Sequence, residues 1–162
     1  DAGDVISTAK TAIGAEETAP ELWDRLAKLG GELLVETIPH LADGTASRTP
    51  QDGSAFTYAP MLTKAMSPVD WSRPAGAIHC QIRGLQPWPC AIAEIDGRSC
   101  KLFRSVIGGE TAAAPGTILR ADKHGIEIAC GDGRSLRILE LQGEGGKRMN
   151  AASYLNGHPI QL

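Results

Sequence analysis

The organisation of this chain is decided by residues 70–89, which read Asp70-Trp71-Ser72-Arg73-Pro74-Ala75-Gly76-Ala77-Ile78-His79-Cys80-Gln81-Ile82-Arg83-Gly84-Leu85-Gln86-Pro87-Trp88-Pro89. Ser72 is placed to cap a short helix, and Pro74 falls where a missing backbone N–H is harmless. Ile78, Ile82 and Leu85 recur at helical spacing, so the stretch predicts a helix with one apolar face.

The end of this stretch predicts a change of structure. Gly84 is typical of the left-handed residue that stops a helix, and Pro87-Trp88-Pro89 predicts an extended backbone around a large aromatic anchor. Residues 1–69 carry ten acidic and five basic side chains, whereas residues 70–162 carry nine and eleven. We therefore interpret residues 70–89 as the joint between an acidic helical part and a mildly basic part, which favours an anionic partner for the second.

The part before the joint predicts one long amphipathic helix. Thr18 and Glu21 form a capping box, and Gly44 marks the end of the helix. An apolar stripe typical of core packing is formed by Leu22, Leu26, Leu29, Leu33, Ile38 and Leu41. A short strand is expected between Val5 and Lys10, and residues 45–69, interrupted by proline and glycine, predict a surface linker.

The part after the joint predicts short strands. These are residues 91–95, 100–104, 115–120, 126–130 and 136–141, with a Gly/Ala-rich loop at 108–114. Asp96-Gly97 and Gly131-Asp132-Gly133 predict hairpin turns, and Asn150 is placed to cap a last short helix. Five such strands favour a small closed or nearly closed barrel.

The cysteines and histidines do not predict a metal site. The four cysteines form no C-x-x-C pair, so we interpret them as reduced, packed thiols rather than a disulfide or zinc site. The histidines lack metal-ligand spacing and are expected to be structural or surface residues, namely His40, His79, His124 and His158. With no long apolar run and no signal peptide, we expect a cytoplasmic protein with no membrane partner.

Many ordered motifs over most of the chain carry a resemblance to a known family. They are Thr57-Tyr58-Ala59-Pro60-Met61-Leu62-Thr63-Lys64, Val69 to Ala75, Ile78-His79, Gln81-Ile82-Arg83, Pro87-Trp88-Pro89, Pro115-Gly116-Thr117-Ile118, Cys130 to Gly133, Leu139-Glu140-Leu141-Gln142, and Met149 with Ala151 to Leu155-Asn156-Gly157. In this order they closely resemble methionyl-tRNA formyltransferases. The resemblance implies an α+β chain: the end of a Rossmann-like formyltransferase domain (1–44), a linker (45–69), and a joint helix with an OB-like tRNA-binding barrel (70–162).

The resemblance also implies one catalytic residue. Asp1-Ala2-Gly3-Asp4 matches the last four positions of the family motif Leu-Asp-x-Gly-Asp/Pro, although Ala2 departs from the usual Thr. Asp1 then corresponds to the catalytic aspartate, which assists formyl transfer from 10-formyltetrahydrofolate to the amino group of Met on initiator tRNA without a metal. The family's Asn-x-His motif lies upstream, so we expect a fragment that is inactive alone and needs the missing N-terminal part of the catalytic domain.

The second implied site is a basic face that meets the acceptor arm of initiator tRNA. The basic side chains expected to contact the tRNA are Lys64, Arg83, Lys101, Arg104, Lys147 and Arg148. After Trp88 only Phe103 and Tyr154 are aromatic, so phosphate contacts are expected to dominate over base stacking.

Two other functions remain open at this point. One is a sister folate-dependent formyltransferase that acts on a sugar nucleotide or free folate. The other is a non-catalytic RNA-binding module.

If residues 1–44 lack most of the sheet they pack on, Leu22, Leu26, Leu29 and Leu33 should be partly exposed. The bacterial cytoplasm is the expected location, with an organellar matrix as the alternative.

Overall fold

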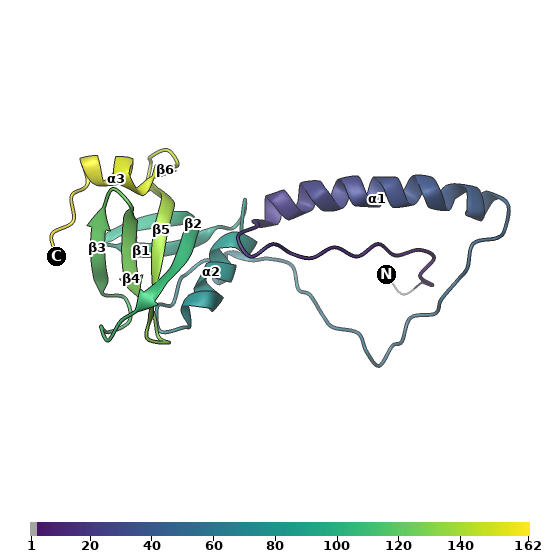
Figure 1. Cartoon of the computed structure of the whole chain (residues 1–162), viewed down its shortest axis with the longest axis horizontal. Helices are drawn as coiled ribbons and strands as arrows, with labels where there is room; N and C mark the ends of the chain where they lie inside the picture. Colours follow the sequence, from purple (N-terminus) through teal and green to yellow (C-terminus); the bar gives the residue numbers. More distant parts are fainter. Residues whose placement is uncertain (1–2) are drawn as a thin grey trace. The chain divides into compact units, whose positions relative to one another are not determined.

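The computed structural model describes residues 3–162, so Asp1 and Ala2 lie outside the described residues (Figure 1). The chain divides into two compact units, Asp1–Met61 and Leu62–Leu162. The first contains α1 (Ala19–Ala42), and the second contains all of the strands. In order, the elements of the second unit are η1 (Lys64–Met66), α2 (Ala75–Gly84), β1 (Ala91–Ile95), β2 (Arg98–Glu110), β3 (Ile118–Asp122), β4 (Gly125–Ala129), β5 (Arg134–Gly143), β6 (Met149–Asn150) and α3 (Ala151–Gly157).

The limits of α1 confirm the sequence prediction. The Thr18 N–H and hydroxyl both donate to Glu21 Oε2, at 2.8 and 2.7 Å, and complete the capping box. At the other end Asp43 is the C-cap, and Gly44 has a left-handed φ of 76°. Local capping chemistry therefore fixes both ends of this helix.

The apolar stripe of α1 is not a core in this chain. No residue of α1 is buried, and Leu26, Ile38 and Leu41 are exposed by more than 40%. The prediction of core packing is wrong for the described chain, because the described residues place no second apolar layer on this helix. The expected partial exposure of Leu22, Leu26, Leu29 and Leu33 is confirmed.

The predicted strand from Val5 to Lys10 is also wrong. Val5 makes only an isolated bridge, in which it and Thr49 exchange two backbone hydrogen bonds of 2.9 Å. A strand needs a partner over several residues, and no further pairing of this segment occurs among the described residues.

The second unit is built on one antiparallel sheet with the order β1-β2-β5-β4-β3, and β6 pairs with β5. Hydrogen bonds between β1 and β3 are absent among the described residues, so strand pairing leaves the sheet unclosed. The Asp96-Gly97 hairpin is confirmed, with φ of 50° and 72° at the two positions. The predicted loop at 108–114 is partly wrong, because β2 continues to Glu110 through several bulges.

Both faces of the core come from the second unit itself. Figure 1 shows α2 beside β2 and α3 at the end of the sheet that carries β6. The largest fully buried side chains are Ile78, Ile82, Ile95, Leu102, Ile126, Ile128, Leu136, Ile138 and Leu141. Asn150 caps α3 as predicted, since its side chain accepts from the Ser153 N–H at 2.8 Å.

The start of α2 corrects the predicted cap. Ser72 donates its N–H and hydroxyl to Asp70 Oδ1, at 2.9 and 2.6 Å, and α2 begins after Pro74. The Ala75 N–H donates instead to Asp132 Oδ2 at 3.1 Å. The cap therefore comes from the turn between β4 and β5, which is otherwise the predicted hairpin turn.

The thiols of this unit are unpaired, and Cys90, Cys100 and Cys130 are buried while Cys80 is exposed. Burial raises the pKa of Cys130 to about 11. Residues 3–162 hold no cluster of three or more His, Cys, Asp or Glu side chains suited to a metal ion. Within the same residues, no helix is long and apolar enough to cross a membrane.

Candidate nucleic-acid interface

A turn at residues 85–90 follows α2 and carries Trp88, and hydrogen bonds fix its conformation. Gln86 is buried, and its Nε2 donates to Ile82 O and Phe103 O at 3.0 and 2.7 Å. The Cys90 N–H donates to Leu85 O at 2.8 Å, and its thiol donates to Pro87 O at 3.0 Å. These bonds attach residues 85–90 to α2 and β2 and close the turn on itself.

The conformation of this turn corrects two predictions. Gly84 does not have a positive φ and lies inside α2, whose C-cap is Leu85. The Pro87-Trp88-Pro89 segment is a turn with two cis X–Pro bonds, not the expected extended backbone. Trp88 is 52% exposed, so it does not serve as a buried anchor.

Trp88 lines a pocket of about 710 Å³, here called the Trp88 pocket. Lys64 and Lys101 line the same pocket, together with apolar atoms of Val69 and Ile92. Two 2.8 Å hydrogen bonds, from Val69 N to Ile92 O and from Ile92 N to Ser67 O, hold residues 67–69 beside β1. This pairing brings η1, and with it Lys64, next to the sheet.

The register of the sheet places more basic residues on the face that Lys101 occupies. Lys101 lies opposite Ile92 on β1 and opposite Gln142 on β5. A register shift follows Leu102, so that Arg104 lies opposite Glu140. Because residues two apart on a strand share a face, Glu140 and Gln142 point the same way. The bulge therefore puts Lys101 and Arg104 on one side of the sheet.

Arg148 joins this side through two contacts. Its Nε donates to Glu140 Oε2 at 2.9 Å, and its guanidinium lies 4.5 Å from the centre of the Phe103 ring. Burial raises the pKa of the Cys90 thiol, and the charges of Lys101 and Arg148 partly oppose that rise. Gln86 Nε2 in the turn at residues 85–90 donates to Phe103 O at 2.7 Å, so the residue whose ring Arg148 covers is bonded to this turn. We call the set Lys64, Trp88, Lys101, Arg104 and Arg148 the Trp88 face.

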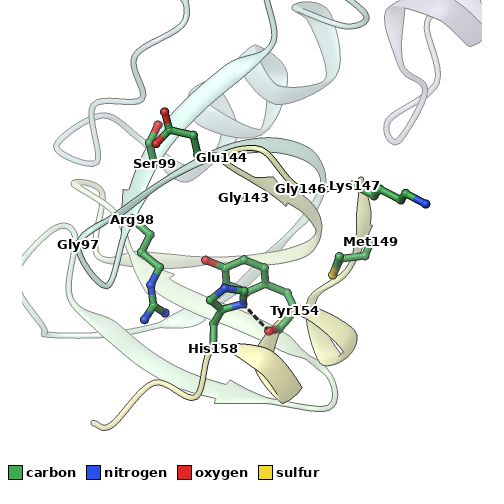
Figure 2. A pocket seen from close by; sticks show the side chains of 10 residues that line it. All are labelled: Gly97, Arg98, Ser99, Gly143, Glu144, Gly146, Lys147, Met149, Tyr154 and His158. Carbon is green, nitrogen blue, oxygen red and sulfur yellow. Dashed lines mark hydrogen bonds between the residues drawn. The ribbon is translucent and has the colours of Figure 1, made fainter.

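The other two predicted basic residues lie elsewhere. Lys147 lines a separate pocket of about 350 Å³ that also holds Arg98, Tyr154 and His158 (Figure 2). In Figure 2 the Lys147 side chain extends away from the stacked Tyr154 and His158 rings, whose centroids are 4.5 Å apart. Arg83 lies in the last turn of α2, where its Nη2 contacts Cys80 Sγ at 3.5 Å.

Three other arginines of the sheet have hydrogen-bond or ion-pair partners within the protein, unlike the lysines of the Trp88 pocket. Arg137 bonds Glu127 at 2.9 Å, Arg134 Nη2 donates to Gly108 O at 3.1 Å, and Arg120 lies 4.0 Å from Asp122. Neither Lys64 nor Lys101 has an ion-pair partner among residues 3–162. Their charges are therefore available to an anionic ligand, although Glu94 lines the same pocket.

The sequence did not single out Trp88 as a functional residue. Its neighbours in the chain are prolines, which predict an extended backbone but not the exposure of the indole between them. The predicted catalytic residue, Asp1, lies outside the described residues.

Comparison with known proteins identifies the family. Residues 61–159 match the family described as "Formyl transferase, C-terminal domain". The chain therefore belongs to this family.

Curated relatives resemble the chain over its whole length. A methionyl-tRNA formyltransferase of Trichlorobacter lovleyi is 47% identical over 162 residues, which are 100% of this chain and 51% of that protein. The methionyl-tRNA formyltransferase of Bacillus velezensis is 38% identical over 162 residues, which are 99% of this chain and 51% of that protein. The chain thus spans about half the length of the curated relatives it matches.

Solved structures share the fold at low sequence identity. HypX of Aquifex aeolicus in complex with tetrahydrofolic acid has a TM-score of 0.71 and 19% identity, covering 95% of this chain and 27% of that one. An N-formyltransferase of Helicobacter canadensis, solved with folinic acid and dTDP-3-aminofucose, has a TM-score of 0.66 and 17% identity, covering 85% and 50%. At such identities these likenesses establish the fold alone.

Proposed function

We propose that this chain is the C-terminal half of a methionyl-tRNA formyltransferase and that its second unit binds initiator tRNA. The observation that carries the proposal is identity of 38–47% to enzymes of that name along the whole chain. The unpaired lysines of the Trp88 pocket support it, because phosphate contacts provide most of the affinity of proteins for nucleic acids.

The whole enzyme would form a C–N bond between the formyl carbon of 10-formyltetrahydrofolate and the amino nitrogen of Met-tRNA. The bond from that carbon to folate nitrogen breaks, and the attacking amine loses a proton. Asp1 is the proposed catalytic residue of this chain, acting on a histidine that the family places upstream. Removal of oxyanion donors typically lowers rates by about 10²–10³. The chain alone should therefore be inactive.

The finer assignments belong to the same proposal. Residues 1–44 would complete a Rossmann-like catalytic domain, residues 45–69 would connect it, and residues 70–162 would act as an OB-like module in the bacterial cytoplasm. Such a module would hold the acceptor arm by its phosphates and position the aminoacyl end for reaction. Lys64, Arg83, Lys101, Arg104, Lys147 and Arg148 are the proposed phosphate contacts.

A sugar-nucleotide substrate is the second candidate, because sugar formyltransferases share the fold. The discriminating experiment is a formylation assay of the enzyme that contains this chain, with 10-formyltetrahydrofolate and either Met-tRNA or a dTDP-amino sugar. We expect formyl-Met-tRNA only. Formylation of the amino sugar without formylation of Met-tRNA would contradict the proposal, as would formylation by residues 1–162 alone.

A further inference from the structure

The Trp88 pocket has features that phosphate binding alone does not explain. Its most prominent member is an indole that is 52% exposed, on a turn tied by the hydrogen bonds of Gln86 and Cys90. A large apolar ring kept at a surface by buried polar bonds is available for a ligand at little further loss of conformational entropy. Lys64 and Lys101 line the same pocket.

This combination is suited to a nucleotide. Indole rings stack on nucleobases of any sequence, and lysine ammonium groups bind phosphate as point charges. The pocket volume of about 710 Å³ lies within the usual range for small-molecule sites. Glu94 also lines the pocket, and its carboxylate is unsuited to a site for phosphate alone.

The ligand must present an open base face. In a duplex each base is stacked on both sides, so an aromatic side chain reaches base faces only in loops, bulges and single-stranded ends. A double-stranded stem could meet Lys64 and Lys101 but could not stack on Trp88.

We propose that Trp88 stacks on an unpaired nucleotide of the RNA substrate, with Lys64 and Lys101 on the phosphates beside it. This inference rests on the proposed function and deepens it. It revises the sequence-based expectation that phosphate contacts dominate over base stacking. The second unit then distinguishes an RNA with a correctly placed unpaired nucleotide from a simple duplex.

The direct test is fluorescence titration of residues 1–162 with two probes at low salt. One is a single-stranded RNA pentanucleotide, and the other is a blunt RNA duplex of the same composition. We expect the pentanucleotide to quench indole emission in the unchanged chain and in Trp23→Phe. The quenching should disappear in Trp88→Phe, and the duplex should not produce it. Equal quenching in Trp88→Phe, or none in the unchanged chain, would overturn the inference.

Affinity for initiator tRNA gives the second readout. Base–aromatic stacking is worth about 1–3 kcal/mol, so Trp88→Ala should weaken binding about 5- to 150-fold. Trp88→Phe should weaken it less, because a phenyl ring still stacks. Trp23→Ala, which removes an indole that is 76% exposed in the first unit, should leave binding unchanged.

If circular dichroism shows that Trp88→Ala is unfolded, Lys64→Gln and Lys101→Gln replace it as the test variants. Both should weaken pentanucleotide binding, whereas Lys123→Gln on the turn after β3 should not. If Lys123→Gln weakened pentanucleotide binding as much as Lys64→Gln and Lys101→Gln do, the inference would be overturned. Salt-sensitive tRNA binding that is unaffected by Trp88→Ala would remove the stacking site and leave the proposed function intact. Quenching by the pentanucleotide in an enzyme that does not formylate Met-tRNA would support the stacking site and contradict the proposed function.

Discussion

The two units of this chain use their apolar residues in opposite ways. In the first, α1 has no buried residue, and Trp23, Leu34 and Val35 are more than half exposed. In the second, α2, the strands and α3 contribute to a single buried cluster. The second unit thus contains both sides of its core. Among the described residues the first unit has the apolar face of α1 but no second apolar layer that covers it. Mutations of the same kind should therefore have different effects in the two units.

Removal of a large apolar side chain should give the largest difference. Ile138 is fully buried on β5, and Ile138→Ala should lower the free energy of unfolding by about 2–5 kcal/mol. Leu34 is 57% exposed on α1, and Leu34→Ala should change it by less than about 0.5 kcal/mol. Urea unfolding followed by circular dichroism measures both. Similar losses would mean that α1 belongs to the same cooperative core.

Addition of a methyl group at a glycine should give the next largest difference. A Cβ on Gly131 would lie 1.7 Å from the Ser72 carbonyl oxygen, so Gly131→Ala should destabilise the second unit by about 1–3 kcal/mol. A Cβ on Gly31 meets nothing within 4 Å. Because alanine favours helix by about 1 kcal/mol, Gly31→Ala should raise the helicity of α1. Thermal unfolding tests the first change and far-ultraviolet dichroism the second.

The two helix caps allow a finer comparison. Asp132→Ala removes the acceptor of the Ala75 N–H and should destabilise the second unit by about 1 kcal/mol. Asp132→Asn should cost less, because it keeps one acceptor oxygen for the two N–H donors, those of Ala75 and Arg134. Thr18→Ala removes the capping box of α1 and should lower helicity without altering the midpoint of the second unit. A loss from Asp132→Asn as large as that from Asp132→Ala would contradict the cap.

The smallest expected difference concerns pH. Hydrogen bonds from Ser135 and Arg137 hold the pKa of Glu127 below its usual value. Because this pKa is lower in the folded state, the contribution is fully present above the unfolded value of about 4.3 and is lost as pH falls through the folded value. Glu127→Gln should therefore flatten the acid limb of stability below about pH 4.3, the unfolded value.

A matched pair in the first unit controls for this effect. The hydrogen bond from Arg25 likewise lowers the pKa of Glu17. The Arg25 side chain is 39% exposed, so solvent should weaken that pair and Glu17→Gln should change the acid limb less. An unchanged acid limb in Glu127→Gln would show that Glu127 contributes no net stability.

What the sequence could predict was local. The capping box at Thr18, the Asp96-Gly97 turn and the Asn150 cap depend on residues within four positions of each other, and all three are confirmed. The cap of α2 was missed because Asp132 lies 57 positions from Ala75. Only the fold brings these residues together.

The candidate site shows the same limit. Lys64 and Lys101 were selected from family resemblance, but their common pocket depends on the pairing of residues 67–69 with β1. The bulge that places Arg104 beside Lys101 has no clear signature in the sequence. The contact of Arg148 with Phe103 and Glu140 likewise joins segments that are distant along the chain.

The most direct test of the account is a hydrogen-exchange footprint of residues 1–162 with and without saturating initiator tRNA. We expect slower exchange in peptides covering residues 62–70, 86–104 and 140–149, and no change in α1 at residues 19–42. Protection confined to α1 or to the β3–β4 hairpin would contradict the assignment of RNA binding to the Trp88 face, as would the absence of any protection at saturation.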